Sequence, residues 1–236
     1  MAELCNLDTG DGEMPTLLYR PAEAPRGGVV VIQEAFGVTD HIASIGDRLA
    51  DAGYLAVVPA LFHRLGSPAF AYDDFEHVMP AMGTLTADGL RADVTAAVGL
   101  LASEGIAPTA RGMVGFCMGG TVTFLASTMG LLHAGVTFYG GGVTAGRFGL
   151  PSLLEMAPSL DAAWLGLYGD LDQGIPVDQV EALREATVNA EVPTQVVRYA
   201  EAEHGFNCSD RASFNAAASD DAWARTLAWF ETYLTA

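Results

Sequence analysis

Cys117 lies in the segment Gly115-Phe116-Cys117-Met118-Gly119, directly after a short apolar run and directly before a helix-like one. A sharp turn from a strand into a helix folds the backbone back on itself. Side chains at the two flanking positions would crowd that turn, so glycine is favoured there. Such an elbow holds a nucleophile out at the carboxyl edge of a sheet. The segment therefore predicts covalent acyl transfer by a thiolate, whereas the plainer alternative is an inert buried thiol.

A cysteine nucleophile needs a base, and the base needs an acid that orients it. His204 follows the last predicted strand, and Asp172 follows the strand before it. Cys117, Asp172 and His204 would then each lie at the carboxyl end of a strand, the edge at which open α/β sheets bind ligands. On the residues alone Asp170 competes with Asp172, because either could cap the helix that begins near Pro176. The other histidines are expected at the surface or at helix ends: His41, His63, His77 and His133.

Glu34 ends the first buried strand, where a carboxylate is costly unless it is paired. It could be a helix cap or a surface charge, or it could be the partner for the proton of Cys117. In the second case its charge would keep Cys117 a neutral thiol, because two negative charges in a dry cleft repel each other. The backbone N–H groups of Met118 and Ala35 are the expected oxyanion donors.

The chain is strongly acidic, with a net charge of −18, and all eleven of its basic residues are arginine. Phosphate contacts need a basic surface, so this composition argues against nucleic acid and anionic membranes as partners. The first residues lack the basic and long apolar parts of a secretion signal, and no apolar run is long enough to span a membrane. We therefore expect a cytoplasmic protein. Three scattered cysteines predict no disulfide framework, and no Cys/His spacing resembles a zinc site.

Strand-like and helix-like segments alternate along the 236 residues, which predicts a single α/β domain (1–236) with a mostly parallel sheet and helices on both faces. The expected strands are 27–33, 55–60, 111–115, 134–139, 162–168 and 194–199. The expected helices are 41–54, 87–104, 119–129, 176–190 and 220–234. Residues 63–86 fit neither pattern, and such an irregular stretch is a candidate cover for the active site.

Together these motifs resemble dienelactone hydrolases, the cysteine branch of the α/β-hydrolases, over nearly the whole chain. The matching segments are Gln33-Glu34-Ala35-Phe36-Gly37, Gly115-Phe116-Cys117-Met118-Gly119-Gly120, Tyr139-Gly140-Gly141, Gly169-x-x-Asp172-x-x-x-Pro176 and Glu203-His204-Gly205-Phe206. The resemblance implies the α/β-hydrolase fold and a reaction that uses neither metal nor cofactor. It also selects Asp172 over Asp170, because the family aspartate lies four residues before the proline.

The resemblance implies a mechanism for the matching positions. Cys117 rests as a thiol that points toward Glu34, until substrate displaces Glu34 and this carboxylate takes the proton. The thiolate then turns toward His204 and attacks the ester carbonyl, while the two backbone donors hold the oxyanion. Water activated by His204, with Asp172 behind it, cleaves the resulting thioester.

In this family two arginines hold a carboxylate of the substrate. Arg211 matches one of them, although it could equally form an ion pair with Asp210 or Glu203. The other belongs in residues 63–86, which do not align with the family pattern. Arg64 is a candidate substitute for it. A carboxylate-bearing lactone is therefore one expectation for the substrate, and a larger or less charged ester is another.

Aromatic residues match three further pocket positions, and each could instead pack in the core: Phe36, Tyr139 and Phe206. The reaction we expect is hydrolysis of a small-molecule activated ester or enol lactone. Two alternatives are a broader carboxylesterase or thioesterase on the same scaffold, and a catalytically silent member that binds a ligand. The sequence makes no prediction of the oligomeric state.

Overall fold

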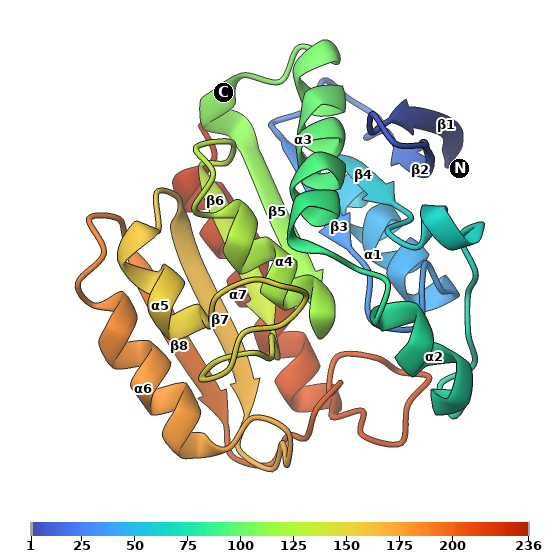
Figure 1. The fold of residues 1–236 in the computed structure, drawn as a ribbon. Helices are drawn as coiled ribbons and strands as arrows, with labels where there is room; N and C mark the ends of the chain where they lie inside the picture. Colours follow the sequence, from blue (N-terminus) through green and yellow to red (C-terminus); the bar gives the residue numbers. More distant parts are fainter. Residues whose placement is uncertain (1, 236) are drawn as a thin grey trace.

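Eight strands form one sheet in the computed structural model, which describes residues 2–235. The strands are β1 (Glu3–Asp8), β2 (Glu13–Tyr19), β3 (Gly28–Ile32), β4 (Leu55–Pro59), β5 (Arg111–Phe116), β6 (Ala134–Phe138), β7 (Ala163–Gly169) and β8 (Thr194–Tyr199). Their order across the sheet is β1-β2-β4-β3-β5-β6-β7-β8, and the six strands β3 to β8 run parallel to one another. The expected α/β-hydrolase fold with a mostly parallel sheet is confirmed (Figure 1).

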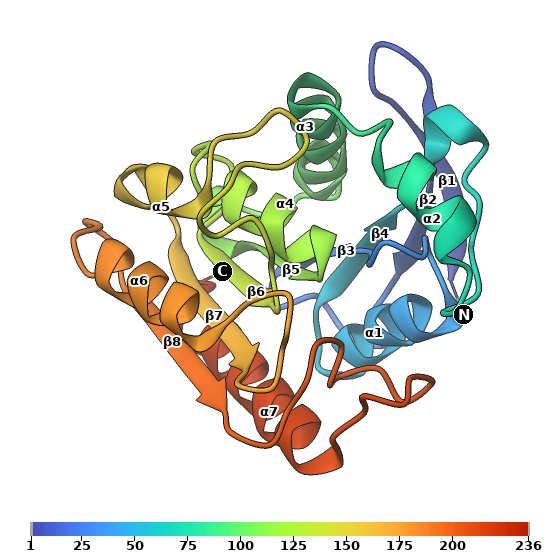
Figure 2. The ribbon, with the colours of Figure 1, turned by 60° about the horizontal axis from the view of Figure 1, so that its bottom comes forward.

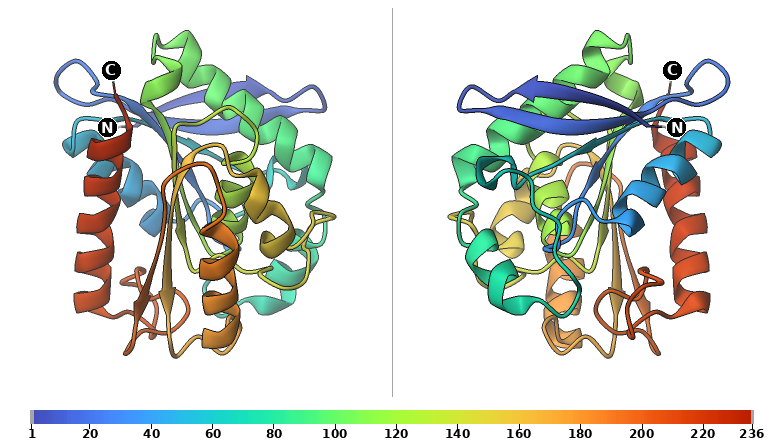
Figure 3. Two further views of the ribbon diagram at one scale, coloured as in Figure 1. Left: turned by 90° about the vertical axis from the view of Figure 1, so that its left-hand side faces the viewer. Right: turned by 90° about the vertical axis from the view of Figure 1, so that its right-hand side faces the viewer.

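Helices cover both faces of the sheet, as the alternating pattern predicts. They are α1 (Asp40–Asp51), α2 (Phe75–Met82), α3 (Ala87–Ser103), α4 (Met118–Ala126), α5 (Leu153–Met156), α6 (Val177–Thr187) and α7 (Ala216–Tyr233). Figure 3 shows α1 and α7 on one face and α3, α4 and α6 on the other. The last helix begins four residues before its expected start, because Asn215 caps it by accepting a hydrogen bond from the backbone N–H of Ala218 at 3.1 Å.

The central strands are buried along their whole length because helices lie above and below them. Strands β3, β4, β6 and β7 contain no exposed residue and consist largely of valine, alanine, leucine and glycine. Such continuous apolar runs are typical of parallel sheets covered on both faces. The apolar pattern of these strands is the reason that the sequence alone could place them.

An N-terminal hairpin extends the sheet beyond what the sequence predicts. Strands β1 and β2 pair antiparallel, and β2 joins the sheet by pairing antiparallel with β4. The outermost strand, β1, has no fully buried residue, and Leu4 is 69% exposed. An edge strand of this kind carries almost no hydrophobic signal, so the pattern does not reveal it.

Residues 63–86 contain a short helix, which the sequence pattern did not predict. Helix α2 begins after Asp74, whose side chain accepts a hydrogen bond from the backbone N–H of His77, and it continues through Pro80. Proline in a helix of eight residues weakens the helical pattern. Phe75 and Met79 lie one turn apart on this helix and are more than half exposed.

The parallel strands all end at one edge of the sheet, and the loops that follow them meet there. Figure 2 looks toward this edge, where the loops after β6, β7 and β8 and helix α2 surround the start of α4. Ligands bind at this edge in open α/β sheets, so a functional site is expected here. Among residues 2–235, no helix is long and apolar enough to cross a membrane.

Candidate active site

Cys117 occupies the sharp turn between β5 and α4, with a φ of 56° that is rare for any residue except glycine. Its backbone N–H donates to the carbonyl of Phe138 at 3.0 Å, which ties the turn to the neighbouring strand. A side chain at Gly115 would collide with the carbonyl of Gly119, and one at Gly119 would collide with the carbonyl of Gln33. The two glycines are therefore required by the packing of the elbow, as the sequence predicts.

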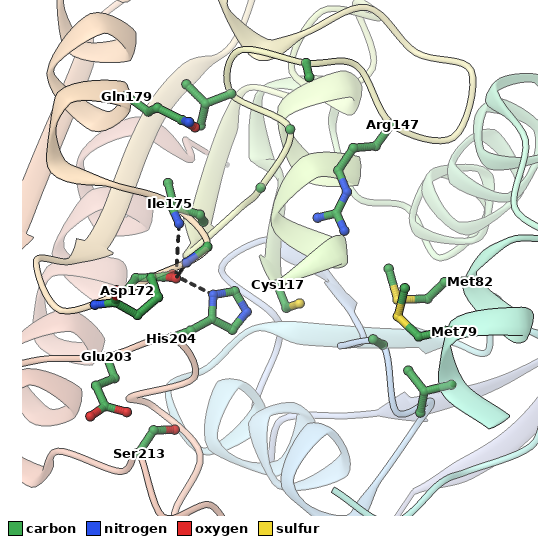
Figure 4. A pocket seen from close by; sticks show the side chains of 18 of the residues that line it. Met79, Met82, Cys117, Arg147, Asp172, Ile175, Gln179, Glu203, His204 and Ser213 are labelled. Atoms are coloured by element: carbon green, nitrogen blue, oxygen red, sulfur yellow. Dashed lines mark hydrogen bonds and ion pairs between the residues drawn. The ribbon is translucent and has the colours of Figure 1, made fainter. Parts of the chain in front are cut away.

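His204 and Asp172 form a hydrogen-bonded pair beside Cys117, built from the loops that follow β8 and β7. His204 Nδ1 lies 2.6 Å from Asp172 Oδ2. The other carboxylate oxygen, Oδ1, accepts from the backbone N–H groups of Gly174 at 2.8 Å and Ile175 at 3.2 Å, so the carboxylate is held from both sides (Figure 4). This leaves Nε2 of His204 as the ring nitrogen that is free to act in chemistry.

Asp170, the competing aspartate, is turned away from the histidine. Both of its carboxylate oxygens accept from Arg198, at 2.7 and 2.8 Å. Of the two aspartates, Asp172 is therefore the one that contacts His204.

The thiol of Cys117 and the ring of His204 shift each other's protonation. Burial by itself raises the pKa of the Cys117 thiol, but the charge of His204 and the backbone N–H of Met118 lower it, and the net direction is downward. Burial likewise lowers the pKa of His204, while the charge of Cys117 and the hydrogen bond to Asp172 raise it, and the net direction is upward. The pair is thus electrostatically suited to exist as thiolate and imidazolium.

Glu34 lies at the end of β3 with a side chain that is only 1% exposed. Its Oε1 accepts from the hydroxyl of Tyr139 at 3.2 Å and lies 3.7 Å from Nη1 of Arg211, while Oε2 has no hydrogen-bond partner among residues 2–235. Burial raises the pKa of this carboxyl group, against the opposing effects of Arg211, His204 and Tyr139. Glu34 is therefore neither a helix cap nor a surface charge, but a buried acid with a high proton affinity.

One expectation about this region differs from the structure. Arg211 pairs with Glu34, not with Asp210 or Glu203, because its guanidinium lies across the ring of Phe36 at 5.5 Å and so faces inward.

Met118 and Ala35, whose backbone N–H groups are the expected oxyanion donors, both lie near Cys117. Met118 is the first residue of α4, where backbone N–H groups lack partners within the helix, and its N–H is close enough to the sulfur to lower the pKa of Cys117. Ala35 follows β3 and lines the same pocket as Cys117.

A pocket of about 950 Å³ opens above the elbow. Its wall includes Cys117, Asp172, His204, Ala35 and Arg211, and also Leu171 and Ile175 from the loop after β7. Helix α2 supplies the opposite wall with Phe75, Val78, Met79 and Met82. Figure 4 shows Met79 and Met82 facing Cys117 from the side away from His204. The wall formed by α2 is therefore apolar, whereas the wall around Cys117 combines polar and apolar side chains.

The three aromatic positions divide between pocket and core. Phe36 lines the pocket and packs its edge against Tyr72. Tyr139 and Phe206 are fully buried behind the pocket wall, where their rings pack at 5.3 Å from each other. Their placement matches the alternative of core aromatics, although the hydroxyl of Tyr139 reaches Glu34.

Two further expectations need correction. Arg64 does not substitute for the second family arginine, because it pairs with Asp11 and Asp93 and does not line the pocket. His63 is buried and not at the surface, with Nε2 at 3.1 Å from Asp93. Arg64 thus joins the N-terminal hairpin turn to α3, and His63 contacts α3 through Asp93, so both roles are structural.

Sequence reasoning missed Arg147, which lines the pocket from the loop between β6 and α5. The signal that could have revealed it is its position in a glycine-rich loop directly after a buried strand, at the ligand-binding edge. Within residues 2–235 no cluster of histidine, cysteine, aspartate or glutamate has the arrangement of a metal site.

This chain is similar to known proteins in both sequence and structure. The model of the dienelactone hydrolase family matches residues 14–234. A "Putative carboxymethylenebutenolidase" of Methylorubrum extorquens is 37% identical, and the match covers 94% of this chain and 78% of that protein. Carboxymethylenebutenolidase of Pseudomonas putida is 29% identical, with 93% and 92% covered. The crystal structure of a "Putative Dienelactone Hydrolase" from Klebsiella pneumoniae has a TM-score of 0.89 at 36% identity and covers 99% of both chains.

Proposed function

Because this chain belongs to the dienelactone hydrolase family, we propose that it hydrolyses an activated ester or lactone through a thioester on Cys117. The observation that carries the proposal is the Asp172–His204 hydrogen bond of 2.6 Å, in a pocket that Cys117 also lines from a strained elbow. Nucleophile, base and orienting acid are thus combined at one sheet edge.

The first half of the reaction is acylation. The Cys117 thiolate, stabilised by protonated His204, attacks the carbonyl carbon and forms the carbon–sulfur bond. The carbonyl oxygen takes the negative charge and is held by the N–H groups of Met118 and Ala35. As the tetrahedral intermediate collapses, the carbon–oxygen bond to the leaving group breaks, and the leaving oxygen takes the proton of His204, so that the imidazole becomes neutral. An enolate or phenolate leaves readily, which suits a thiolate nucleophile.

Glu34 and Arg211 control when Cys117 ionises. The charge of Glu34 opposes the thiolate, and Arg211 offsets that charge while it remains 3.7 Å away. An anionic substrate competes for Arg211 and draws it from Glu34. The pKa of Glu34, already raised by burial, then rises further, and Glu34 takes the proton of the thiol. The neutral acid that results no longer opposes the thiolate.

The second half is deacylation. His204, oriented by Asp172, removes a proton from water, and the hydroxide formed attacks the thioester carbonyl. The carbon–sulfur bond breaks and the carboxylic acid product forms. The Cys117 thiolate regains its proton from Glu34, while His204 keeps the proton that it took from water, which restores the starting state. No step needs an atom or electron that substrate and water do not supply.

A second candidate function is a broader carboxylesterase. Two observations favour it: the pocket of about 950 Å³ is large for a small lactone, and α2 gives it an apolar wall in which Met79 is 60% exposed. These features suit esters with a bulky apolar part.

A panel of substrates tests the proposal and separates the two candidates. We expect the wild-type protein to cleave activated esters and enol lactones, with kcat/KM at least about 10⁴ M⁻¹s⁻¹ for the preferred class. A preference for simple aryl esters over enol lactones would select the carboxylesterase. No cleavage of any member would contradict both and leave a silent ligand-binding protein.

Glu34→Gln is expected to abolish the response of Cys117 to a bound anion. In the wild type, a carboxylate-bearing lactam analogue should raise the rate at which iodoacetamide alkylates the Cys117 peptide, because the analogue frees Glu34 to take the proton. Glutamine cannot take it, so the analogue should leave the rate of the variant unchanged.

The pH profile of the same alkylation supplies the control. Its midpoint in the free wild type is expected below 9.0, the ordinary pKa of a cysteine thiol, because His204 lowers the pKa of Cys117. The midpoint in Glu34→Gln should be lower still, since a negative charge has been removed. A wild type that does not respond to the analogue would rule out the proposed role of Glu34.

A further inference from the structure

Arg147 extends from the loop between β6 and α5 into the pocket that holds Cys117 (Figure 4). It also lines a neighbouring hollow of about 580 Å³, together with Gly83, residues 85–88, Phe148 and Gly149. Met79 and Met82 line both spaces as well. Cys117, the two methionines and Arg147 therefore line one pocket.

The guanidinium of Arg147 has no acidic partner in residues 2–235. Seven of the eleven arginines form ion pairs with carboxylates: Arg20, Arg26, Arg64, Arg184, Arg198, Arg211 and Arg225. Arg147 forms neither an ion pair nor a side-chain hydrogen bond there, although the chain has 29 acidic residues. A half-buried guanidinium that faces a pocket with all its donors unused is suited to an anion from outside the protein.

The side chain of Arg147 packs against the glycines of its own loop. A Cβ at Gly141 would lie 2.6 Å from Nη1 of Arg147, and one at Gly142 would lie 3.0 Å from its Cγ. The carbonyl of Gly141 accepts from the hydroxyl of Thr121 on α4 at 2.8 Å. Since α4 begins directly after Cys117, the surface under Arg147 is fixed relative to the nucleophile.

The positive φ of Phe148, at 58°, turns the chain directly after Arg147. The carbonyl of Arg147 accepts from the backbone N–H of Leu150 at 2.8 Å and closes this turn. The ring of Phe148 lies 5.6 Å from the guanidinium carbon, which limits the directions in which the side chain can move. The guanidinium is thus held by its own loop and not by a counter-ion.

We propose that Arg147 determines specificity by binding a carboxylate that lies several carbon atoms from the scissile carbonyl, with the intervening apolar chain packed against Met79 and Met82. This inference rests on the proposed hydrolase function and names its substrate class: esters of long-chain dicarboxylic half-acids or compounds of the same shape. A planar guanidinium binds a carboxylate through two parallel hydrogen bonds. Arg211, which pairs with Glu34, is a separate cation.

Matched pairs of aryl esters test this directly. The probes are 4-nitrophenyl half-esters of adipic, suberic and sebacic acid, each compared with its neutral methyl diester. We expect the ratio of kcat/KM for half-ester over diester to fall about tenfold or more in Arg147→Met, mainly through KM. The ratio in Arg147→Lys should lie between those of the wild type and Arg147→Met, because the ammonium of lysine binds a carboxylate as a point charge, without two parallel hydrogen bonds. Arg91→Met, at an exposed arginine of α3 outside both hollows, should keep the wild-type ratio.

Binding of adipate, suberate or sebacate to Cys117→Ala, measured by calorimetry, separates this inference from the proposed function. The additional change Arg147→Met should weaken the preferred dicarboxylate about tenfold or more, whether or not the protein catalyses anything. An unchanged ratio together with unchanged dicarboxylate binding would overturn the role of Arg147. So would an equal loss on half-ester and diester, which is what a purely structural role predicts. Failure of the wild type to cleave any ester would instead contradict the proposed function.

Discussion

Cys117→Ala should leave no ester turnover above the uncatalysed rate, while the free energy of unfolding changes by no more than about 1–2 kcal/mol. The reason for the second expectation is local: alanine keeps the Cβ of Cys117, so the strained φ of 56° and the packing of the elbow are the same in both proteins. Steady-state kinetics and urea unfolding measure the two effects. Retained turnover in a folded variant would refute the assignment of the nucleophile.

Cys117→Ser is the matched variant, since it replaces the sulfur by an oxygen and changes little else. We expect activity at least about a hundredfold below the wild type, because Glu34 is a poor base for a hydroxyl of far higher pKa. Near-normal activity in the serine protein would contradict the account in which Glu34 takes the proton of a thiol.

His204→Gln is expected to lower kcat by about 10³- to 10⁴-fold, the second large effect. Two functions disappear together: the positive charge that lowers the pKa of Cys117, and the base that activates water for deacylation. Single-turnover kinetics should show both acylation and deacylation slowed. Glutamine is polar and similar in size to histidine, so a cavity does not explain the loss.

Asp172→Asn provides the graded comparison for His204→Gln. Asparagine can accept the same backbone hydrogen bonds from Gly174 and Ile175, but its amide favours the wrong tautomer of His204. We expect a loss that does not exceed the loss in His204→Gln, and little additional loss in the double variant. Losses that multiply in the double variant would show that the two side chains do not act as a unit.

The parts of the fold that the sequence could predict are those with a strong local signal. The central parallel strands are continuous apolar runs, and the elbow is marked by Gly115 and Gly119 at positions where any Cβ would collide with backbone. The order of Cys117, Asp172 and His204 along the chain follows from where strands end. In each case the residue type is fixed by its immediate surroundings, so short segments of sequence are sufficient to predict the feature.

The parts that the sequence could not predict depend on contacts between distant segments. Strand β1 is an exposed edge, and α2 is a short helix interrupted by proline, so neither has a clear period. The Glu34–Arg211 ion pair joins residues that are far apart in the chain. Other acidic residues lie closer to Arg211 in the sequence, so the sequence favoured those as its partners. Arg147 was overlooked because only the folded loop shows that it faces the pocket and has no acidic partner in the described part of the chain.

The central claim is that substrate acylates the sulfur of Cys117, and intact-mass spectrometry of acid-quenched reactions tests it most directly. His204→Gln mixed with a 4-nitrophenyl ester should gain the mass of one acyl group, on the peptide that contains Cys117, and lose it in neutral hydroxylamine. Cys117→Ala should gain nothing. An adduct on another residue, or turnover by the wild type with no adduct at any time in either protein, would contradict the account.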